Sequence, residues 1–133
     1  MRLTDEIFME LNSNGLYRMT FKPEDLPVPI NPAGFWSLTM YNPSGQLVAN
    51  PINRYTIGSQ NMLTTDPDGS ITIYIQRDDP GGQMTNNWLP ASQNQNERFY
   101  MLFRAYYPED VMFMPTDQPA YILPEVVKVG EAP

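Results

Sequence analysis

The sequence contains no cysteine and no histidine. Without cysteine, the chain has no disulfide framework and no thiolate to act as a nucleophile or metal ligand. Without histidine, it lacks the commonest metal ligand and the usual general base near neutral pH. We therefore expect no metal site, no cofactor and no catalytic residue. Any chemistry would depend on carboxylate, Tyr, Lys or Arg side chains.

Positive charge is also scarce. Eight Lys and Arg face 15 Asp and Glu, which gives a net charge of -7 and a pI near 4.3. This balance would repel a phosphate backbone, so we expect no nucleic-acid partner. No apolar run approaches the roughly 18 residues of a spanning helix, and Met1–Ile7 lacks the apolar run of a signal peptide. We expect no membrane insertion. The location is left open, because the lack of cysteine is compatible with the cytoplasm without requiring it.

The chain has the length and apolar content of one globular domain. It has 133 residues, of which 41% are hydrophobic, and 14 Pro and 8 Gly indicate many short elements joined by turns. We expect a single domain over 1–133, with 1–10 as a loosely attached N-terminal segment and 130–133 as a flexible tail.

Strand patterns follow one another along most of the chain. The one helix-like stretch is Leu3–Leu11, where Thr4 would be the N-cap. The turn sequences Asn42–Gly45 and Asp66–Gly69 separate alternating segments, and the proline-rich stretch 23–32 predicts an extended loop. The predicted strands are Leu16–Phe21, Phe35–Tyr41, Gln46–Ala49, Asn53–Ile57, Ser70–Gln76, Arg98–Tyr107 (the longest) and Glu125–Val129. Residues 77–87 are predicted as loop.

About seven or eight short strands at this spacing predict an all-β fold. Each one-faced sheet must cover another, which favours an antiparallel two-sheet sandwich that is jelly-roll-like, with at most one short N-terminal helix.

Five ordered motifs resemble the DUF1214 family. They are Phe35–Tyr41, Asn50–Gly58, Asp68–Gln76, Asn87–Ala91, and Arg104 followed by Tyr106, Tyr107 and Pro108. The resemblance spans about 11–129. It implies a jelly-roll-type sandwich that commonly follows a DUF1254 domain in longer chains, many of which look exported, and it implies no activity. The chain is then either a stand-alone version or a fragment completed by a partner. Residues 112–118 depart from the family pattern.

Five residues are candidate ligand contacts: Arg54, Tyr55, Asn87, Trp88 and Arg104. A partly buried guanidinium would hold a carboxylate or phosphate by two parallel hydrogen bonds. Trp88, together with Trp36, Tyr41 and Tyr74, would offer an aromatic platform for sugars or bases. For the arginines and for Trp88, a structural role is favoured over ligand binding. Each Arg would pin a strand end by pairing with carboxylates or loop carbonyls, and Trp88 would plug the sandwich with its indole N–H on a loop carbonyl.

The carboxylates support no metal or catalytic site by spacing alone. Asp66, Asp68, Asp78 and Asp79 have turn spacing and no Glu at EF-hand distance. Glu97 and Glu109 would serve a glycosidase only at a suitable separation. Nine Met are expected mainly in the core.

Three function classes follow. The favoured one is a non-catalytic structural or interaction domain that binds a second copy or a partner protein through its sheet edges. The second is a small-ligand or carbohydrate-binding module, and the third is a histidine-free hydrolase.

Overall fold

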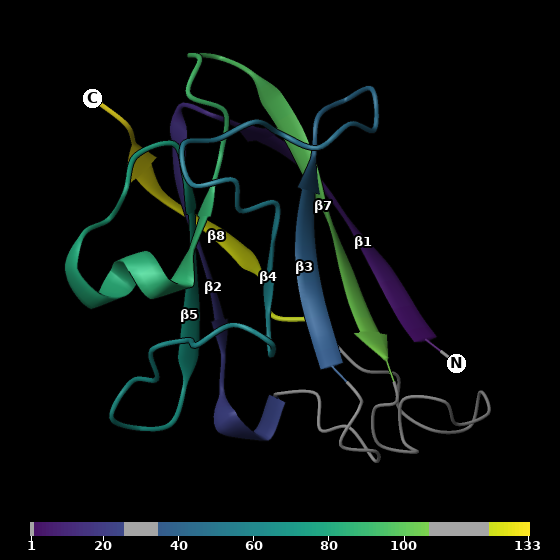
Figure 1. Cartoon of the computed structure of the whole chain (residues 1–133), viewed down its shortest axis with the longest axis vertical. Helices are drawn as coiled ribbons and strands as arrows, with labels where there is room; N and C mark the ends of the chain where they lie inside the picture. Colours follow the sequence, from purple (N-terminus) through teal and green to yellow (C-terminus); the bar gives the residue numbers. More distant parts are fainter. Residues whose placement is uncertain (1, 26–34, 107–122) are drawn as a thin grey trace.

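The computed structural model describes residues 2–25, 35–106 and 123–133, which form a sandwich of two four-stranded sheets (Figure 1). The first sheet has the order β1-β7-β3-β4, and the second has the order β6-β5-β2-β8. The strands are β1 (Arg2–Asn12), β2 (Gly15–Phe21), β3 (Phe35–Tyr41), β4 (Thr56–Gly58), β5 (Ile71–Gln76), β6 (Trp88–Pro90), β7 (Arg98–Tyr106) and β8 (Val126–Glu131). Two 3-10 turns complete the described elements, η1 (Pro23–Asp25) and η2 (Gly82–Asn87).

The all-β, two-sheet prediction is confirmed. Neighbouring strands are antiparallel except β5 and β6, which run parallel. The jelly-roll-like connectivity stays a prediction. Among the described residues, no helix has the length and apolarity needed to cross a membrane.

Alternation along the strands makes the core. In β2, Tyr17, Met19 and Phe21 are buried, because every second side chain points between the sheets. Ile73 and Ile75 of β5 are fully buried, and Ile71 packs against the same cluster, so these three side chains share the inward face of the predicted strand.

Three aromatic rings join the two sheets. Phe21 of β2 lies 4.9 Å from Trp36 of β3 and 6.1 Å from Phe103 of β7, centroid to centroid. All three side chains are buried. Such large rings contribute much of the apolar area that stabilises a sandwich of this size.

The helix-like stretch Leu3–Leu11 lies in strand β1, which agrees with the expectation of at most one short N-terminal helix. β1 pairs antiparallel with β7, and Leu3 is opposite Ala105. The sequence also has period-two spacing, because apolar Leu3, Ile7, Met9 and Leu11 all fall on odd-numbered positions. Pairing with β7, which is interrupted by a register shift between Ile7 and Leu11, satisfies backbone hydrogen-bonding groups along most of the strand, so the tertiary partner outweighs the local capping signal.

The Asp66–Gly69 turn forms as predicted. The Gly69 N–H donates to the Asp66 carbonyl at 2.8 Å, and Gly69 has φ +90°, which favours glycine. The Asn42–Gly45 turn also forms, but its expected second strand is reduced to a single bridge between Leu47 and Tyr41. The strand predicted at Asn53–Ile57 is found at Thr56–Gly58.

Other boundaries shift by a few residues. β1, with 11 residues, is longer than β7, which was expected to be the longest. The loop expected over 77–87 contains η2, and the last strand extends to Glu131. Some predicted features lie outside the described residues. They are the part of the predicted loop at 26–32, the family segment at 112–118, and Tyr107, Pro108 and Glu109.

Candidate functional site

Arg54 fastens the loop before β4 to the segment that leads into β6. Its Nη1 donates to the carbonyls of Thr85 and Trp88 at 2.9 and 2.8 Å, and the side chain is half-buried. The guanidinium therefore has the pinning role considered above, with loop and strand carbonyls as acceptors.

Asn87 and Trp88 lie beside Arg54 and are only 3% exposed each. The Asn87 Oδ1 accepts from the Thr64 N–H at 2.7 Å, and its Nδ2 donates to the carbonyls of Thr64 and Thr72 at 2.8 and 2.9 Å. The Trp88 indole N–H donates to the Gln76 carbonyl at 2.9 Å. Both side chains are therefore committed to internal contacts.

Tyr55 and Arg104 complete the predicted set. The half-buried Tyr55 donates from its hydroxyl to the Asn53 Oδ1 at 3.2 Å. Arg104 lies on β7, in the first sheet, and its Nη1 donates to the Tyr41 hydroxyl at 3.3 Å. The fold thus brings Arg54, Asn87 and Trp88 together and puts Arg104 elsewhere. Ligand binding by these five residues stays a prediction.

The four aromatic residues considered as a platform occupy separate places. Trp36 is in the core and Trp88 is buried outside that cluster. Tyr41 stacks on Tyr100 at 5.5 Å, and Tyr74 lies under the Arg18 guanidinium at 4.6 Å. They therefore offer no common stacking surface.

The described residues form an open groove of about 540 Å³ in a different place. One wall is the β3–β4 loop, at residues 42 and 47–51, and the other is the segment entering β7, at residues 92–94 and 97–99. None of the five predicted residues lines it. We call this feature the 42–99 groove.

The β3–β4 wall is fixed by Asn50. Its Oδ1 accepts from the N–H groups of Ile52 and Arg54, and its Nδ2 donates to the carbonyls of Val48 and Arg54. The half-buried side-chain amide of Asn50 thus closes the loop and connects it to Arg54. Arg54 is in turn hydrogen-bonded to the carbonyls of Thr85 and Trp88.

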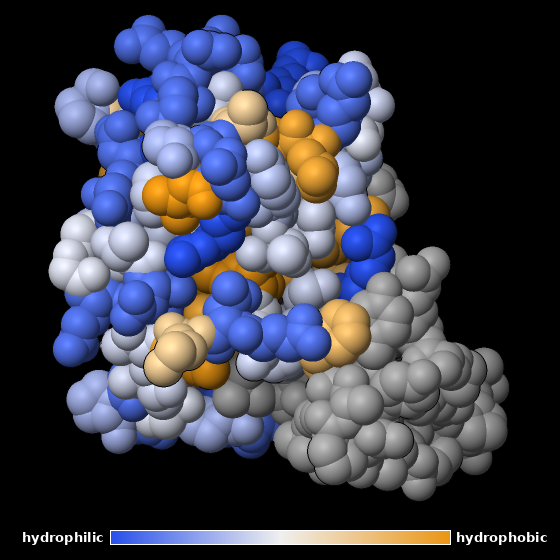
Figure 2. Space-filling view, viewed as in Figure 1, coloured by the Kyte–Doolittle hydropathy of each residue, from blue (hydrophilic) through white to orange (hydrophobic). Residues whose placement is uncertain are grey.

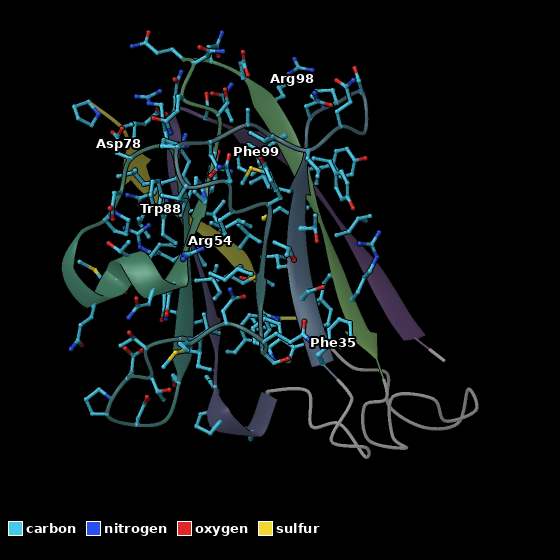
Figure 3. The ribbon with its side chains drawn as sticks, viewed as in Figure 1. Phe35, Arg54, Asp78, Trp88, Arg98 and Phe99 are labelled. Atoms are coloured by element: carbon cyan, nitrogen blue, oxygen red, sulfur yellow. The ribbon has the colours of Figure 1, made fainter. Side chains whose placement is uncertain are left out.

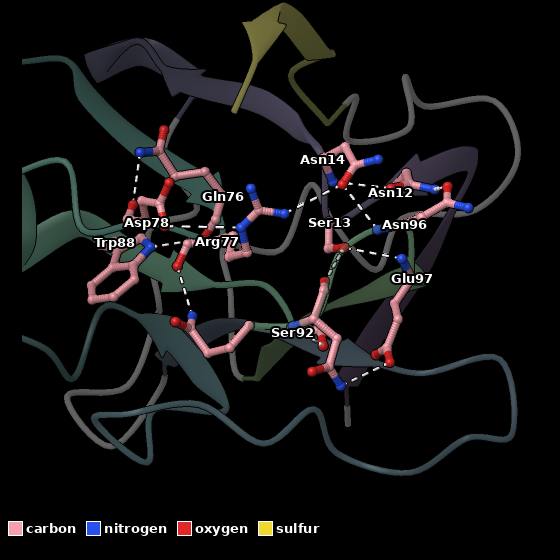
Figure 4. Close-up of polar contacts among 12 residues, drawn as sticks. Asn12, Ser13, Asn14, Gln76, Arg77, Asp78, Trp88, Ser92, Asn96 and Glu97 are labelled. Atoms are coloured by element: carbon pink, nitrogen blue, oxygen red, sulfur yellow. Dashed lines mark hydrogen bonds and ion pairs between the residues drawn. The ribbon is translucent and has the colours of Figure 1, made fainter. Parts of the chain in front are cut away.

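The opposite wall is fixed by the β1–β2 turn (Figure 4). The Ser13 hydroxyl, fully buried, donates to the Asn94 carbonyl at 2.6 Å and accepts from the Glu97 N–H at 3.0 Å. The Ser13 N–H donates to the Glu97 carbonyl at 2.8 Å. Two neighbours of Ser13 hold Asn96: the Asn12 Nδ2 donates to the Asn96 Oδ1, and the Asn14 Oδ1 accepts from the Asn96 N–H. Hydrogen bonds from the β1–β2 turn therefore position residues 94–97, and Phe99, which belongs to the core cluster, anchors the end of the wall.

One anion and one cation line the groove. Hydrogen bonds from the side chains of Ser92 and Asn94 lower the pKa of Glu97, so its carboxyl is ionised at neutral pH. Arg98 is exposed, at the start of β7 (Figure 3), and its guanidinium makes no hydrogen bond or ion pair with any other described residue. The lining is therefore formally neutral.

Sequence reasoning missed this groove. The polar segment 92–96 carries no motif of its own, and Asn50–Gly58 is informative in the sequence only as a family motif. The available signal was the density of turn-forming amides in both segments, but their meeting across the sandwich depends on sheet order.

Asp68 and Asp79 stabilise turns, as expected from their spacing. The Asp68 Oδ1 accepts from the Ser70 N–H at 2.9 Å, and the Asp79 Oδ1 accepts from Gly81 N–H and the Thr85 hydroxyl. These bonds lower the pKa of both carboxyls. Within 2–25, 35–106 and 123–133, no three acidic groups are placed to share a metal ion.

Comparisons with known proteins support one family. The model of the family described as "Protein of unknown function (DUF1214)" matches residues 1–110. A search of the curated proteins finds no significant match. The crystal structure of the VPA0106 protein from Vibrio parahaemolyticus is similar to this chain, with a TM-score of 0.74 and 27% identity. The match covers 96% of this chain and 30% of that one, so the chain spans less than a third of the length of this relative.

Proposed function

The chain belongs to the DUF1214 family of proteins of unknown function, and we propose that it is a non-catalytic interaction domain that pairs with a second copy of itself through the free edge of β8. The observation that carries the proposal is the combination, on one edge strand, of unpaired backbone and exposed valine.

β8 is the outermost strand of the second sheet. In the described part of the chain it pairs only with β2, so its other edge offers free N–H and C=O groups. Val127 and Val129 are 50% and 55% exposed. An edge with apolar side chains is a template for strand addition, in which backbone hydrogen bonds supply affinity and side chains supply fit.

Charge favours a second copy as the occupant. The chain carries a net charge of -7, but β8 contains one lysine and one glutamate. Lys128 and Glu131 form an ion pair at 2.7 Å, which raises the pKa of Lys128. Two β8 strands therefore approach without local repulsion. Antiparallel pairing of identical strands also fits a two-fold axis, the commonest symmetry of protein dimers.

Association through a broad face of the molecule has less support than pairing through the edge of β8. On the face seen in Figure 2, apolar surface is divided into small patches among polar side chains. Isolated exposed apolar residues are normal in monomers, whereas an unpaired edge requires protection or a partner.

A carbohydrate platform at Trp88 and a histidine-free hydrolase lack a supporting contact. A carbohydrate platform at Trp88 requires an open ring, and this ring is 3% exposed. A hydrolase acid requires a carboxyl whose pKa is raised, whereas the pKa values of Asp68, Asp79 and Glu97 are lowered. Glu109 lies outside the described residues.

The test is the mass of the protein in solution. Light scattering coupled to size exclusion is expected to give a dimer at high micromolar concentration that dissociates on dilution. The double variant Val127→Lys, Val129→Lys puts two like charges on each edge and is expected to weaken dimerisation at least about tenfold.

Ile52→Lys is the matched control, since it adds a lysine at an exposed apolar residue of the β3–β4 loop. It is expected to leave the dimer intact. A wild-type protein that stays monomeric at high concentration, or a double variant that dimerises as well as Ile52→Lys, would contradict the proposal.

A further inference from the structure

We propose that the 42–99 groove binds a small organic monocarboxylate with an apolar body, and that Arg98 holds the carboxylate. This inference is independent of pairing through β8, because none of the groove residues belongs to that strand.

Arg98 supplies the charge for recognition. It is the only lysine or arginine that lines the groove, and it has no hydrogen-bond or ion-pair partner among the described residues. A guanidinium presents a planar fork of N–H donors that matches the two oxygens of a carboxylate. Every other arginine whose side chain is described here donates at least one hydrogen bond to the protein, so Arg98 differs from them.

An apolar wall lies beside this cation. Leu47 is 50% exposed, and Val48, Pro51 and Phe99 also line the groove. An open groove with a hydrophobic wall and one unpaired charge fits a ligand that combines an apolar body with a single charged end. The volume of about 540 Å³ is within the range of small-molecule sites.

Charge and shape narrow the ligand class. The ionised carboxylate of Glu97 disfavours a second anionic group, so nucleotides and dicarboxylates fit poorly. Sugars fit poorly as well, because Phe99 is the only aromatic residue of the lining and is 5% exposed, which leaves no open ring for stacking.

Both walls are held before any ligand arrives. Asn50 fixes the β3–β4 loop, and Ser13 fixes the segment before β7. A site whose backbone is already ordered loses less conformational entropy on binding.

The test uses hexanoate as the probe, with hexanamide and succinate as matched compounds. Amide NMR titration of the whole chain is expected to give saturable shifts for hexanoate at residues 47–50 and 92–99. Hexanamide lacks the charge and succinate lacks the apolar end, so each is expected to bind at least about tenfold more weakly.

Arg98→Gln is expected to weaken hexanoate binding by about tenfold to a hundredfold, because it removes a charge-assisted pair. Leu47→Ser is expected to weaken it about threefold or more by removing part of the apolar wall. Both side chains are exposed, so both variants are expected to keep the wild-type spectrum elsewhere.

Lys22→Gln makes the same change in net charge on an exposed residue outside the groove, and is expected to change the Kd less than twofold. The proposal is overturned by hexanoate shifts that do not saturate or that map outside the groove. It is equally overturned by equal binding of hexanoate and hexanamide, or by an Arg98→Gln protein that binds as tightly as the Lys22→Gln protein.

Discussion

Several polar side chains that look like ligand contacts in the sequence act as internal fasteners. Arg54, Asn87 and Trp88 are each hydrogen-bonded to backbone groups of neighbouring segments. The reason is general: loops that pack over a sheet carry backbone groups that need partners, and long polar side chains reach them. The sequence predicts such residues, but whether they face a carbonyl or a ligand depends on which loops meet.

At Asn87 the role can be tested by stability. Asn87→Ala removes three hydrogen bonds of a buried side chain and leaves partly buried backbone groups of Thr64 and Thr72 without these partners. We expect a loss of about 2 to 4 kcal/mol in the free energy of unfolding. Urea unfolding measures it.

Asn86→Ala is the matched control, because Asn86 is the exposed neighbour and makes one hydrogen bond, to the Thr64 hydroxyl. Its loss is expected to stay within about 0.5 kcal/mol. Equal losses in the two variants would show that the buried bonds of Asn87 contribute no more than a surface contact.

Among the elements, β4 depends on a close approach between backbones. A Cβ built at Gly58 would lie 2.1 Å from the carbonyl oxygen of Trp36 and 2.8 Å from the Cα of Ser37. Both are backbone atoms of β3, which cannot rotate away. Glycine is therefore required where this three-residue strand pairs with β3.

Gly58→Ala is expected to lower the free energy of unfolding by about 3 kcal/mol or more, because β4 must move away from β3. Gly130→Ala in β8 is the control, since a Cβ there meets only the Leu16 Cδ1 at an ordinary 3.5 Å. Its effect is expected to be below about 1 kcal/mol. Thermal unfolding compares the two variants. A Gly58→Ala protein as stable as Gly130→Ala would show that the contact between β4 and β3 does not require glycine at position 58.

For the whole molecule, acid is expected to weaken the fold. The Thr85 hydroxyl and then the Gly81 N–H lower the pKa of Asp79, and hydrogen bonds also lower the pKa values of Asp68 and Glu97. A carboxyl whose pKa is lower in the folded state stabilises the fold above its unfolded pKa, near 4. That stabilisation is lost as the pH falls through the folded pKa.

The Tm is therefore expected to fall between pH 5 and pH 3, measured by thermal unfolding. Asp79→Asn is expected to reduce this fall, because the substituted side chain does not titrate. Glu125→Gln removes an exposed carboxylate that makes no hydrogen bond to another described residue, and is expected to leave the fall unchanged. An Asp79→Asn protein with the wild-type pH dependence would contradict the role given to this carboxyl.

Short-range patterns in the sequence determined much of the fold. Alternation in 71–76 and 98–106, and the Asp66–Gly69 turn, predict strands and turns that are present, because side-chain period and turn geometry are local properties. The absence of cysteine and histidine likewise determined which chemistry is improbable.

Only the tertiary structure decided what depends on distant pairing. β1 is a strand because β7 lies beside it, and Trp88 is buried because the Gln76 carbonyl is there to accept its N–H. The 42–99 groove exists because the β3–β4 loop and the segment before β7 meet at one end of the sandwich. Residues about 50 positions apart come together through sheet order, which side-chain periodicity does not encode.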